Sequence, residues 1–275
     1  VEYNTSTNPT FEGAVRDTSG RGLDGAFTTG AGYDANGKML SFNGATTSGV
    51  SIGGATGVGG DKPFSIGLWF KTNQNPVSTD VLTYIGGNEA SRETVTLTFS
   101  TTQIKTEFYG QSMGVNPSGG INVGTWYHVV ATYPGGGHHN VNILVNGLKL
   151  SQTNYGGSAT ALIPENADIF IGKYFNASNT GFNGAISQFK LYDTALTAEE
   201  VKTLYDMGRL GNGLYPLHID APVYINGPLY APGSILNISQ FVDDVSRTVT
   251  SSTANQTGYI TPPINMKAGS KVKLD

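Results

Sequence analysis

Apolar and polar side chains alternate along short segments of this chain, which is the pattern of β-strands with one buried and one solvated face. In the segment TVTLTF, the apolar residues Val95, Leu97 and Phe99 alternate with threonines. Other segments are apolar almost throughout, such as FSIGLWFKT at residues 64–72, which has Trp69 inside it. These segments are joined by Gly-rich turns, and together they predict a chain that is all-β over most of its length.

The segment TWYHVVATYPGGGHHNVNILVNGLKL predicts a β-hairpin. One strand is expected from Trp126 to Tyr133, followed by a loop over Pro134–His139, and the return strand ends at Asn146–Gly147. Asn-Gly tolerates the positive φ angles that a type I′ turn requires. Trp126 and Trp69 are mid-strand positions in this prediction, so both are expected in the core.

The residues after Thr197 depart from the β pattern and predict one short helix. Thr197 is a good N-cap, and Glu200 three residues later completes a capping box. Val201 and Tyr205 belong to an apolar stripe at helical spacing, and Gly208 is expected to end the helix as its C-cap. A helix of three turns is too short to be stable alone in water, so the stripe is expected to pack on a sheet.

The chain changes character after this helix, where Gly, Pro and Tyr become frequent. We predict a main domain over residues 1–210, a linker over residues 211–216 and a small β segment over residues 217–275. The last segment is too short and too poor in Leu, Ile and Phe to bury a strong core by itself. It is therefore expected to pair with the main domain or with copies of itself.

Charge and residue content exclude several classes of function. The 16 Lys and Arg against 20 Asp and Glu give a net charge of −4 without any basic run. Because phosphate binding needs clustered cations, nucleic acid is not an expected partner. The chain has no Cys, which removes disulfides, thiolate nucleophiles and Cys-type zinc sites. No apolar run approaches the ~20 residues that span a bilayer, so membrane insertion is not expected either.

Several strings occur in the order typical of laminin-G/pentraxin-like concanavalin A jelly-roll domains. They are GKMLSFNGATTSGVSIGG, FSIGLWFKT, TWYHVVATY, NVNILVNGLKL, DIFIGKYF and GFNGAISQFKLYDTALTAEEVKTLYDMG. Residues from about 10 to 208 therefore resemble this family. The resemblance implies a two-sheet antiparallel jelly-roll sandwich with one short C-terminal helix that closes the fold, followed here by the small C-terminal β appendage. It also implies binding of glycans or protein ligands, and in many members a calcium ion near one edge.

The C-terminal segment carries a second resemblance. Its strings YAPGSILNISQF and TGYITPPINMKAGSKVKL are similar to a β motif found near the ends of structural proteins of bacteriophages and large algal viruses. In those proteins the motif typically forms or caps a trimeric spike or fibre. The resemblance implies a homo-trimer held through the C-terminal segment and a location on the virion surface, hence extracellular.

A calcium site is one of two interpretations of the string RDTSGRGLDG. It resembles the D-x-S-G-N-G start of the family, and it places Asp17 and Asp24 in a Gly-rich loop. Hard cations take carboxylate and carbonyl oxygens from such flexible loops. The alternative is an Asx-type turn in which Asp17 bonds its own backbone. Ser187 stands in the closing strand where the family often has an acidic residue, which weakens the calcium interpretation.

Catalysis is not expected from the carboxylates. Jelly-roll glycosidases place an acid and a nucleophile about 5 Å apart, as in the pattern E-x-D-x-x-E, and no strand here carries that spacing. Glu199 and Glu200 are adjacent on the expected helix, so they point apart. His138 and His139 could chelate a metal from a loop, but no third ligand is identifiable, which favours a solvated polar turn.

A glycan site needs a flat aromatic face and planar polar groups, and such residues are found in the expected loops. For each of them the alternative role is packing in the core or at its rim. The candidate glycan-binding residues are Tyr109, Tyr133, His138, His139, Tyr155, Tyr174 and Asn176.

These inferences combine into a non-enzymatic, carbohydrate-binding-type domain of a virion surface or fibre protein. Its expected partners are host cell-surface glycans or other virion proteins. Two other functions remain open. The chain could be a structural capsid or fibre decoration without a ligand, or the glycan-binding module of an extracellular carbohydrate-active enzyme.

Overall fold

The computed structural model describes residues 1–54, 57–76, 80–86, 92–108, 110–176, 181–211, 238–242 and 271–274. The chain forms two compact units, Val1–Gly208 and Arg209–Asp275. The first unit is a sandwich of two antiparallel sheets with one α-helix among its described residues, which confirms the all-β jelly-roll prediction.

The first sheet of the sandwich has eight strands in the described part of the chain. Its order is β15 (Leu148–Lys149), β14 (Asn142–Val145), β13 (Tyr127–Tyr133), β8 (Phe64–Thr72), β18 (Asn183–Tyr192), β6 (Met39–Asn43) and β5 (Ala31–Asp34), and β1 (Glu2–Tyr3) also pairs with β18. The central strands β13, β8 and β18 come from distant parts of the sequence, so this sheet depends on long-range pairing.

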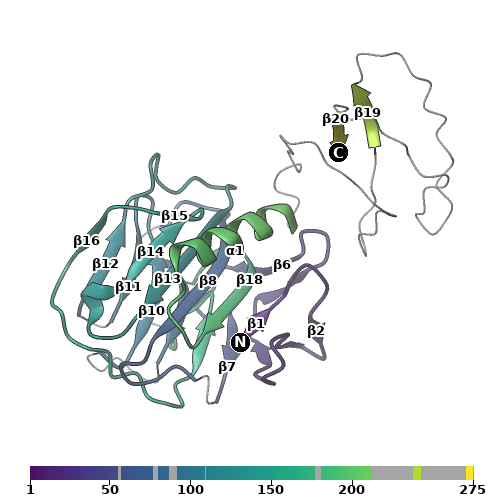
Figure 1. Ribbon diagram of the computed structural model, residues 1–275. Helices are drawn as coiled ribbons and strands as arrows, with labels where there is room; N and C mark the ends of the chain where they lie inside the picture. The colour runs from purple at the N-terminus through teal and green to yellow at the C-terminus, as the bar shows by residue number, and fades with distance from the viewer. Residues whose placement is uncertain are drawn as a thin grey trace. The chain divides into compact units, whose positions relative to one another are not determined.

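The second sheet has ten strands among the described residues. Its order is β16 (Gln152–Asn154), β12 (Ser112–Val115), β11 (Ile104–Glu107), β10 (Val95–Phe99), β9 (Asp80–Ile85), β17 (Ile169–Ile171), β7 (Val50–Ile52), β4 (Gly25–Phe27), β3 (Ala14–Val15) and β2 (Thr10–Phe11). Figure 1 shows β10, β11, β12 and β16 side by side at one end of the sandwich.

The core lies between the two sheets and follows the alternation of the sequence. On β10, Val95, Leu97 and Phe99 are buried in this core, as predicted. On β8, Phe70 points into the core while Trp69, its neighbour, faces the opposite side and is also buried. The strand is apolar from Ile66 to Phe70 because both of its faces are covered there, one by the second sheet and the other by the helix.

The predicted hairpin forms between β13 and β14, in the register Val129 opposite Val145. The Asn-Gly turn lies at the other end of β14, between β14 and β15, where Asn146 has φ 52° and Gly147 has φ 75°, the positive angles that the pair was expected to adopt. The side-chain oxygen of Asn146 also accepts a hydrogen bond from the backbone N–H of His128 at 2.9 Å. The loop between β13 and β14 contains a short 3₁₀ helix, η1 (His138–Asn140).

Helix α1 (Ala198–Gly211) starts where the sequence predicts. The capping box is present, since the N–H of Thr197 donates to Glu200 Oε2 at 2.8 Å and the N–H of Glu200 donates to Thr197 Oγ1 at 3.2 Å. The predicted end was wrong, because Gly208 lies inside the helix. A Cβ at Gly208 would overlap Trp69 Nε1 and lie 2.9 Å from Trp69 Cε2. The glycine is needed for close packing and does not cap the helix.

Trp126 also differs from its prediction. It precedes β13 and is only half-buried, and the Nζ of Lys71 lies 5.2 Å from the centroid of its ring. Trp69 is buried as expected. The two tryptophans differ in exposure because Trp69 lies within β8 and is covered by α1. Trp126 lies just before the start of β13, outside the strand.

In the second unit, after the last three residues of α1, the described residues form two antiparallel strands, β19 (Ile238–Val242) and β20 (Lys271–Leu274). The rest of the predicted β segment, residues 217–275, lies outside the described residues, as do residues 212–216 of the predicted linker. Within the described part of the chain, no helix combines the length and the apolar character needed to cross a bilayer.

Candidate functional site

The outer face of the eight-stranded sheet is covered by α1. Val201 on the helix packs against Val130 and Leu144 of the sheet. Tyr205 stacks on Trp69 with ring centroids 5.4 Å apart and an angle of 19° between the planes. Figure 1 shows the helix lying across β13, β14, β8 and β18. The outer face of the ten-stranded sheet, in contrast, is not covered by α1.

A row of residues crosses the outer face of that sheet on neighbouring strands. Thr98 on β10 is in register with Lys105 on β11, which is in register with Gly114 on β12, and Gly114 faces Thr153 on β16. Phe99, next to Thr98, points into the core. Because side chains alternate between the faces of a strand, Thr98 and Lys105 point outward.

Tyr155 lies two residues after Thr153, just beyond β16, with 49% of its surface exposed. Gln103 Nε2 donates to the Tyr155 hydroxyl at 2.6 Å and to Asn116 Oδ1 at 3.0 Å. The Nζ of Lys105 lies 4.9 Å from the centroid of the Tyr155 ring, within the range of a cation–π interaction. These contacts hold an exposed aromatic ring between a planar amide and a cation.

Gly114 makes this arrangement possible. A Cβ at this position would lie 2.9 Å from Gln103 Cδ and 3.1 Å from Tyr155 Cε2. The missing side chain on β12 therefore lets the amide and the ring lie close against the strand. Any larger residue would push them away from Lys105.

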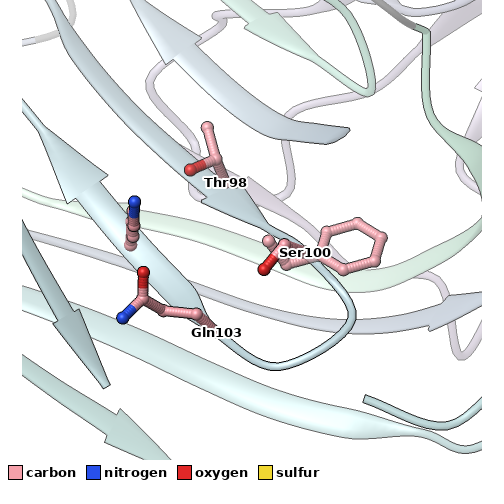
Figure 2. A pocket seen from close by; sticks show the side chains of 5 residues that line it. Thr98, Ser100 and Gln103 are labelled. Atoms are coloured by element: carbon pink, nitrogen blue, oxygen red, sulfur yellow. The ribbon is translucent and has the colours of Figure 1, made fainter. Parts of the chain in front are cut away.

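A small hollow lies beside these residues, lined by Thr98, Phe99, Ser100, Gln103 and Lys105. Figure 2 shows the hydroxyl groups of Thr98 and Ser100 and the amide oxygen of Gln103 around it, with the amide nitrogen of Gln103 turned away. Its volume of about 20 Å³ is close to what a single water-sized group needs. Thr98 is only 5% exposed, and its hydroxyl has no hydrogen-bond partner among the described residues. A buried hydroxyl without a partner costs roughly 1–3 kcal/mol, which a ligand oxygen in the hollow would recover.

An aromatic cluster occupies the same sheet on the other side of β10. Tyr174 meets Tyr84 of β9 edge-on at 4.6 Å between centroids, and Phe175 lies 5.2 Å from Tyr84. The Nζ of Lys173 lies 5.2 Å above the ring of Phe170 on β17, and burial lowers the pKa of this lysine. Thus two aromatic groups, each with a lysine, lie on either side of β10 on this face.

The structure separates the predicted glycan residues. Tyr155 is exposed beside the hollow, and Tyr174 is half-buried in the aromatic cluster, with Asn176 half-buried two residues further on. His139 is exposed in η1, which belongs to the loop between β13 and β14. Tyr109 lies outside the described residues.

Tyr133 and His138 are buried and cannot offer a surface to a sugar. The ring of Tyr133 packs between Phe64 and Phe108, and its hydroxyl contacts Asp61. His138 is fully buried with its ring 5.0 Å from Phe108, and burial lowers its pKa. The sequence placed both at a solvated loop, but their side chains are buried, whereas His139 of the same loop is exposed.

The main polar residues of the hollow were not among the predicted candidates. The alternation around β10 correctly placed Thr98 on the face away from the core, but the assignment of that face to solvent was wrong, because Thr98 is only 5% exposed. Lys105 and Gln103 carried no motif of their own. Only the pairing of β11 with β10 and β12 shows that they share a site with Tyr155.

The residues predicted for calcium do not fit a calcium ion. The carboxylate of Asp17 accepts hydrogen bonds from the backbone N–H groups of Glu2, Ser19 and Leu23 at 2.9–3.1 Å, and Asp24 Oδ1 accepts from the N–H of Asp17 at 2.7 Å. Burial alone would raise the pKa of Asp17, but these hydrogen bonds outweigh burial and hold the pKa below its ordinary value. The contact from Ser19, two residues on, is the Asx-type turn that the sequence left open, and the contact from Leu23 closes the rest of the loop onto the same carboxylate. Among the described residues no three His, Asp or Glu side chains form a group that could hold a metal.

The fold and the site define a concanavalin A-like β-sandwich with a polar and aromatic outer sheet face. Residues 43–202 match the family model described as the concanavalin A-like lectin/glucanases superfamily, of laminin-G type, and the chain belongs to this family. No curated protein sequence matches the chain.

Solved structures with the same fold share little sequence identity with the chain. A Trypanosoma rangeli sialidase aligns at 19% identity and a TM-score of 0.57, over 76% of this chain and 32% of the sialidase. Domain 4 of AbnA, an extracellular arabinanase from Geobacillus stearothermophilus solved with arabinotriose, aligns at 19% identity and a TM-score of 0.54, over 74% of this chain and 96% of the domain. The binding domain of botulinum neurotoxin serotype G aligns at 16% identity and a TM-score of 0.51, over 76% of this chain and 53% of that domain. The chain thus spans about a third of the sialidase, and these similarities show the fold alone.

Proposed function

We propose that the chain is a glycan-binding module that holds a saccharide on the outer face of its ten-stranded sheet. The observation that carries this proposal is the hollow beside Tyr155, into which the unpartnered hydroxyl of Thr98 points. Sugars present hydroxyl groups and an apolar ring face. Aromatic rings and a few convergent polar groups are the usual means of binding such ligands.

The similar folds support this proposal. One of them is a domain of an arabinanase solved with a trisaccharide, and 96% of that domain aligns with this chain. Another belongs to a sialidase. These proteins act on or bind sugars, so a saccharide is the ligand class that the fold and the geometry favour together.

The proposal is for binding without hydrolysis. Glycoside hydrolysis in most families needs two carboxyl groups on opposite sides of the bond that is cleaved. The residues that line the hollow, namely Thr98, Phe99, Ser100, Gln103 and Lys105, include no carboxylate. A saccharide held there would meet donors and an aromatic ring but no acid and nucleophile pair.

The proposal can be tested with a glycan array followed by titration calorimetry on the best ligand. We expect Tyr155→Ala to weaken binding at least about tenfold, equal to about 1.4 kcal/mol, because it removes the exposed ring. Thr98→Val keeps the shape of the side chain and removes a hydroxyl that has no protein partner. We therefore expect it to weaken binding while leaving the melting temperature unchanged or higher.

Leu148→Ala is the matched control, since Leu148 is exposed on the eight-stranded sheet. It should leave glycan affinity unchanged. A wild-type protein that binds no glycan on the array would reject the proposal and favour a structural protein without a ligand. Equal affinity of the wild type, Tyr155→Ala and Thr98→Val would reject this location for the site.

We also propose that the module acts on the surface of a virion, with residues 217–275 assembling the chain into a homo-trimer. Its partners there would be host cell-surface glycans or other virion proteins. This proposal is supported by the sequence resemblance of the C-terminal segment, and the described strands β19 and β20 agree with the β character expected of it.

The alternative, a binding module of an extracellular carbohydrate-active enzyme, is favoured by a different observation. This chain matches nearly all of an arabinanase domain but only about a third of a sialidase, so the fold occurs within larger enzymes. The neighbouring genes would separate the two settings. Virion structural genes would support the first, and a catalytic domain encoded in the same gene would support the second.

A further inference from the structure

We infer that the site selects an anionic saccharide, whose carboxylate or sulfate group lies against Lys105 and places one oxygen in the hollow. The inference rests on the proposed function, because it names the class of glycan that the same site would take. It follows from the charge and the donors around the hollow.

Lys105 is a cation without an acidic partner in the described part of the chain. No Asp or Glu oxygen there lies within 4.0 Å of its Nζ, whereas the Nζ atoms of Lys62, Lys190 and Lys202 each have a carboxylate oxygen at 2.5–2.7 Å. Lys105 is half-buried, and its Nζ contacts the Tyr155 ring. With no other charged residue in the lining, the hollow has a formal charge of +1.

The nearest carboxylate along the strand lies away from the hollow. Glu107 shares the outer face of β11 with Lys105, but it is in register with Thr96 and Ser112, one row beyond Lys105. Gln103, which does line the hollow, lies on the opposite side of Lys105 along the chain. Two residues of a strand span about 7 Å, so Lys105 separates Glu107 from the hollow.

The free polar groups of the hollow suit an acceptor. The amide nitrogen of Gln103 is already engaged by Tyr155 and Asn116. The donors that remain are the ammonium group of Lys105 and the hydroxyl groups of Thr98 and Ser100, and they outnumber the one amide acceptor of the lining, Gln103 Oε1. An oxygen of a carboxylate or sulfate accepts from all of these, and hydrogen bonds to a charged partner are about twice as strong as neutral ones. The hollow has room for about one such oxygen.

Lys173 provides a second positive charge on the same face. Among the described residues it too has no carboxylate within 4.0 Å, and it lies over Phe170 on β17. Strands β10 and β9 separate β17 from β11. Three strand spacings amount to about 14 Å, so a glycan with more than one acidic unit could reach both lysines.

The test is an array that pairs each acidic glycan with a neutral counterpart of the same backbone. Uronate and sialate glycans are paired with their carboxyl-reduced forms, and sulfated glycans with their desulfated forms. We expect the wild type to bind at least one acidic member about tenfold more tightly than its neutral counterpart. The preference should shrink as salt rises from about 0.05 M to about 0.5 M, because salt screens exposed charges.

Lys105→Met removes the charge and keeps the aliphatic stem. It should reduce the acidic preference to less than about threefold, equal to about 0.7 kcal/mol. Lys149→Met is the control, since it removes the same charge from an exposed position on the eight-stranded sheet, and it should keep the preference. The carboxyl-reduced and desulfated arms show which acidic group is recognised.

Two outcomes would overturn the inference and leave the proposed function intact. One is a wild type that binds neutral glycans as tightly as their acidic counterparts. The other is an acidic preference that persists in Lys105→Met. A wild type that binds no glycan of either kind would reject the proposed function and the inference with it.

Discussion

Gly208 shows how one residue is fixed by a contact that lies across the molecule. A glycine inside a helix costs about 1 kcal/mol relative to alanine. At this position, however, a Cβ would overlap the indole nitrogen of Trp69, which α1 covers. The cost of the glycine is therefore offset by the close approach of the helix to β8.

Gly208→Leu should destabilise the protein in spite of its better helix propensity. We expect a net loss of about 1–2 kcal/mol in the free energy of unfolding, because inserting a side chain into a packed contact costs about 1–3 kcal/mol. Met207→Leu, at a neighbouring position that is 66% exposed, should change the free energy of unfolding by less than about 0.5 kcal/mol. Urea denaturation of both variants checks this. A Gly208→Leu variant as stable as the wild type would show that the contact is loose.

At the scale of elements, α1 seals one face of the eight-stranded sheet over a buried histidine. His128 on β13 packs 5.0 Å from Trp69 and 5.9 Å from Tyr205 between ring centroids. Its Nδ1 has no hydrogen-bond partner among the described residues, and burial lowers its pKa to about 3. The contact between helix and sheet therefore requires this imidazole to be neutral.

This histidine should make the protein sensitive to acid. The pKa of His128 is lower in the folded chain than its ordinary value of 6.5, so the unfolded chain binds the extra proton. The contribution of neutral His128 to the free energy of unfolding is complete above pH 6.5 and is lost as the pH falls toward 3. We expect it to account for about 2–3 kcal/mol of lost unfolding free energy between pH 6.5 and about 4.5.

His128→Phe should flatten that dependence, measured by urea denaturation at a series of pH values. A smaller slope should remain, because burial also lowers the pKa of His138. His139→Gln, at an exposed position, should keep the slope of the wild type. An unchanged slope in His128→Phe would show that water reaches the imidazole in the folded protein.

At the scale of the whole molecule, the chain forms two units, and the sandwich has its own core. The buried apolar cluster between the two sheets runs from Val1 to Leu191 without any described residue of the second unit. The first unit is thus expected to fold by itself. The second unit is the part for which the sequence predicts self-association.

Deleting residues 217–275 should leave a sandwich that still melts cooperatively, since its core is intact. The full-length chain is expected to be a trimer and the shortened chain a monomer. Light scattering coupled to gel filtration measures both masses, and circular dichroism follows the melting. The same monomeric mass for both chains would reject assembly through the C-terminal segment.

The sequence by itself determined those features that depend on near neighbours along the chain. Alternation placed Val95, Leu97 and Phe99 on one face and the threonines of β10 on the other. The Asn146–Gly147 turn and the start of α1 were predicted for the same reason, because turns and N-caps are set by residues within a few positions of each other.

Only the tertiary structure decided what distant segments do to one another. Position 208 of the helix requires a glycine because the ring of Trp69 occupies the space of a side chain. Tyr133 is buried because it pairs with Phe64 on β8. The candidate site has the same origin. Tyr155 meets Gln103 and Lys105 through the pairing of β16 with β12 and of β12 with β11. The register of strands that are far apart in sequence brings these side chains together, and no local pattern encodes that register.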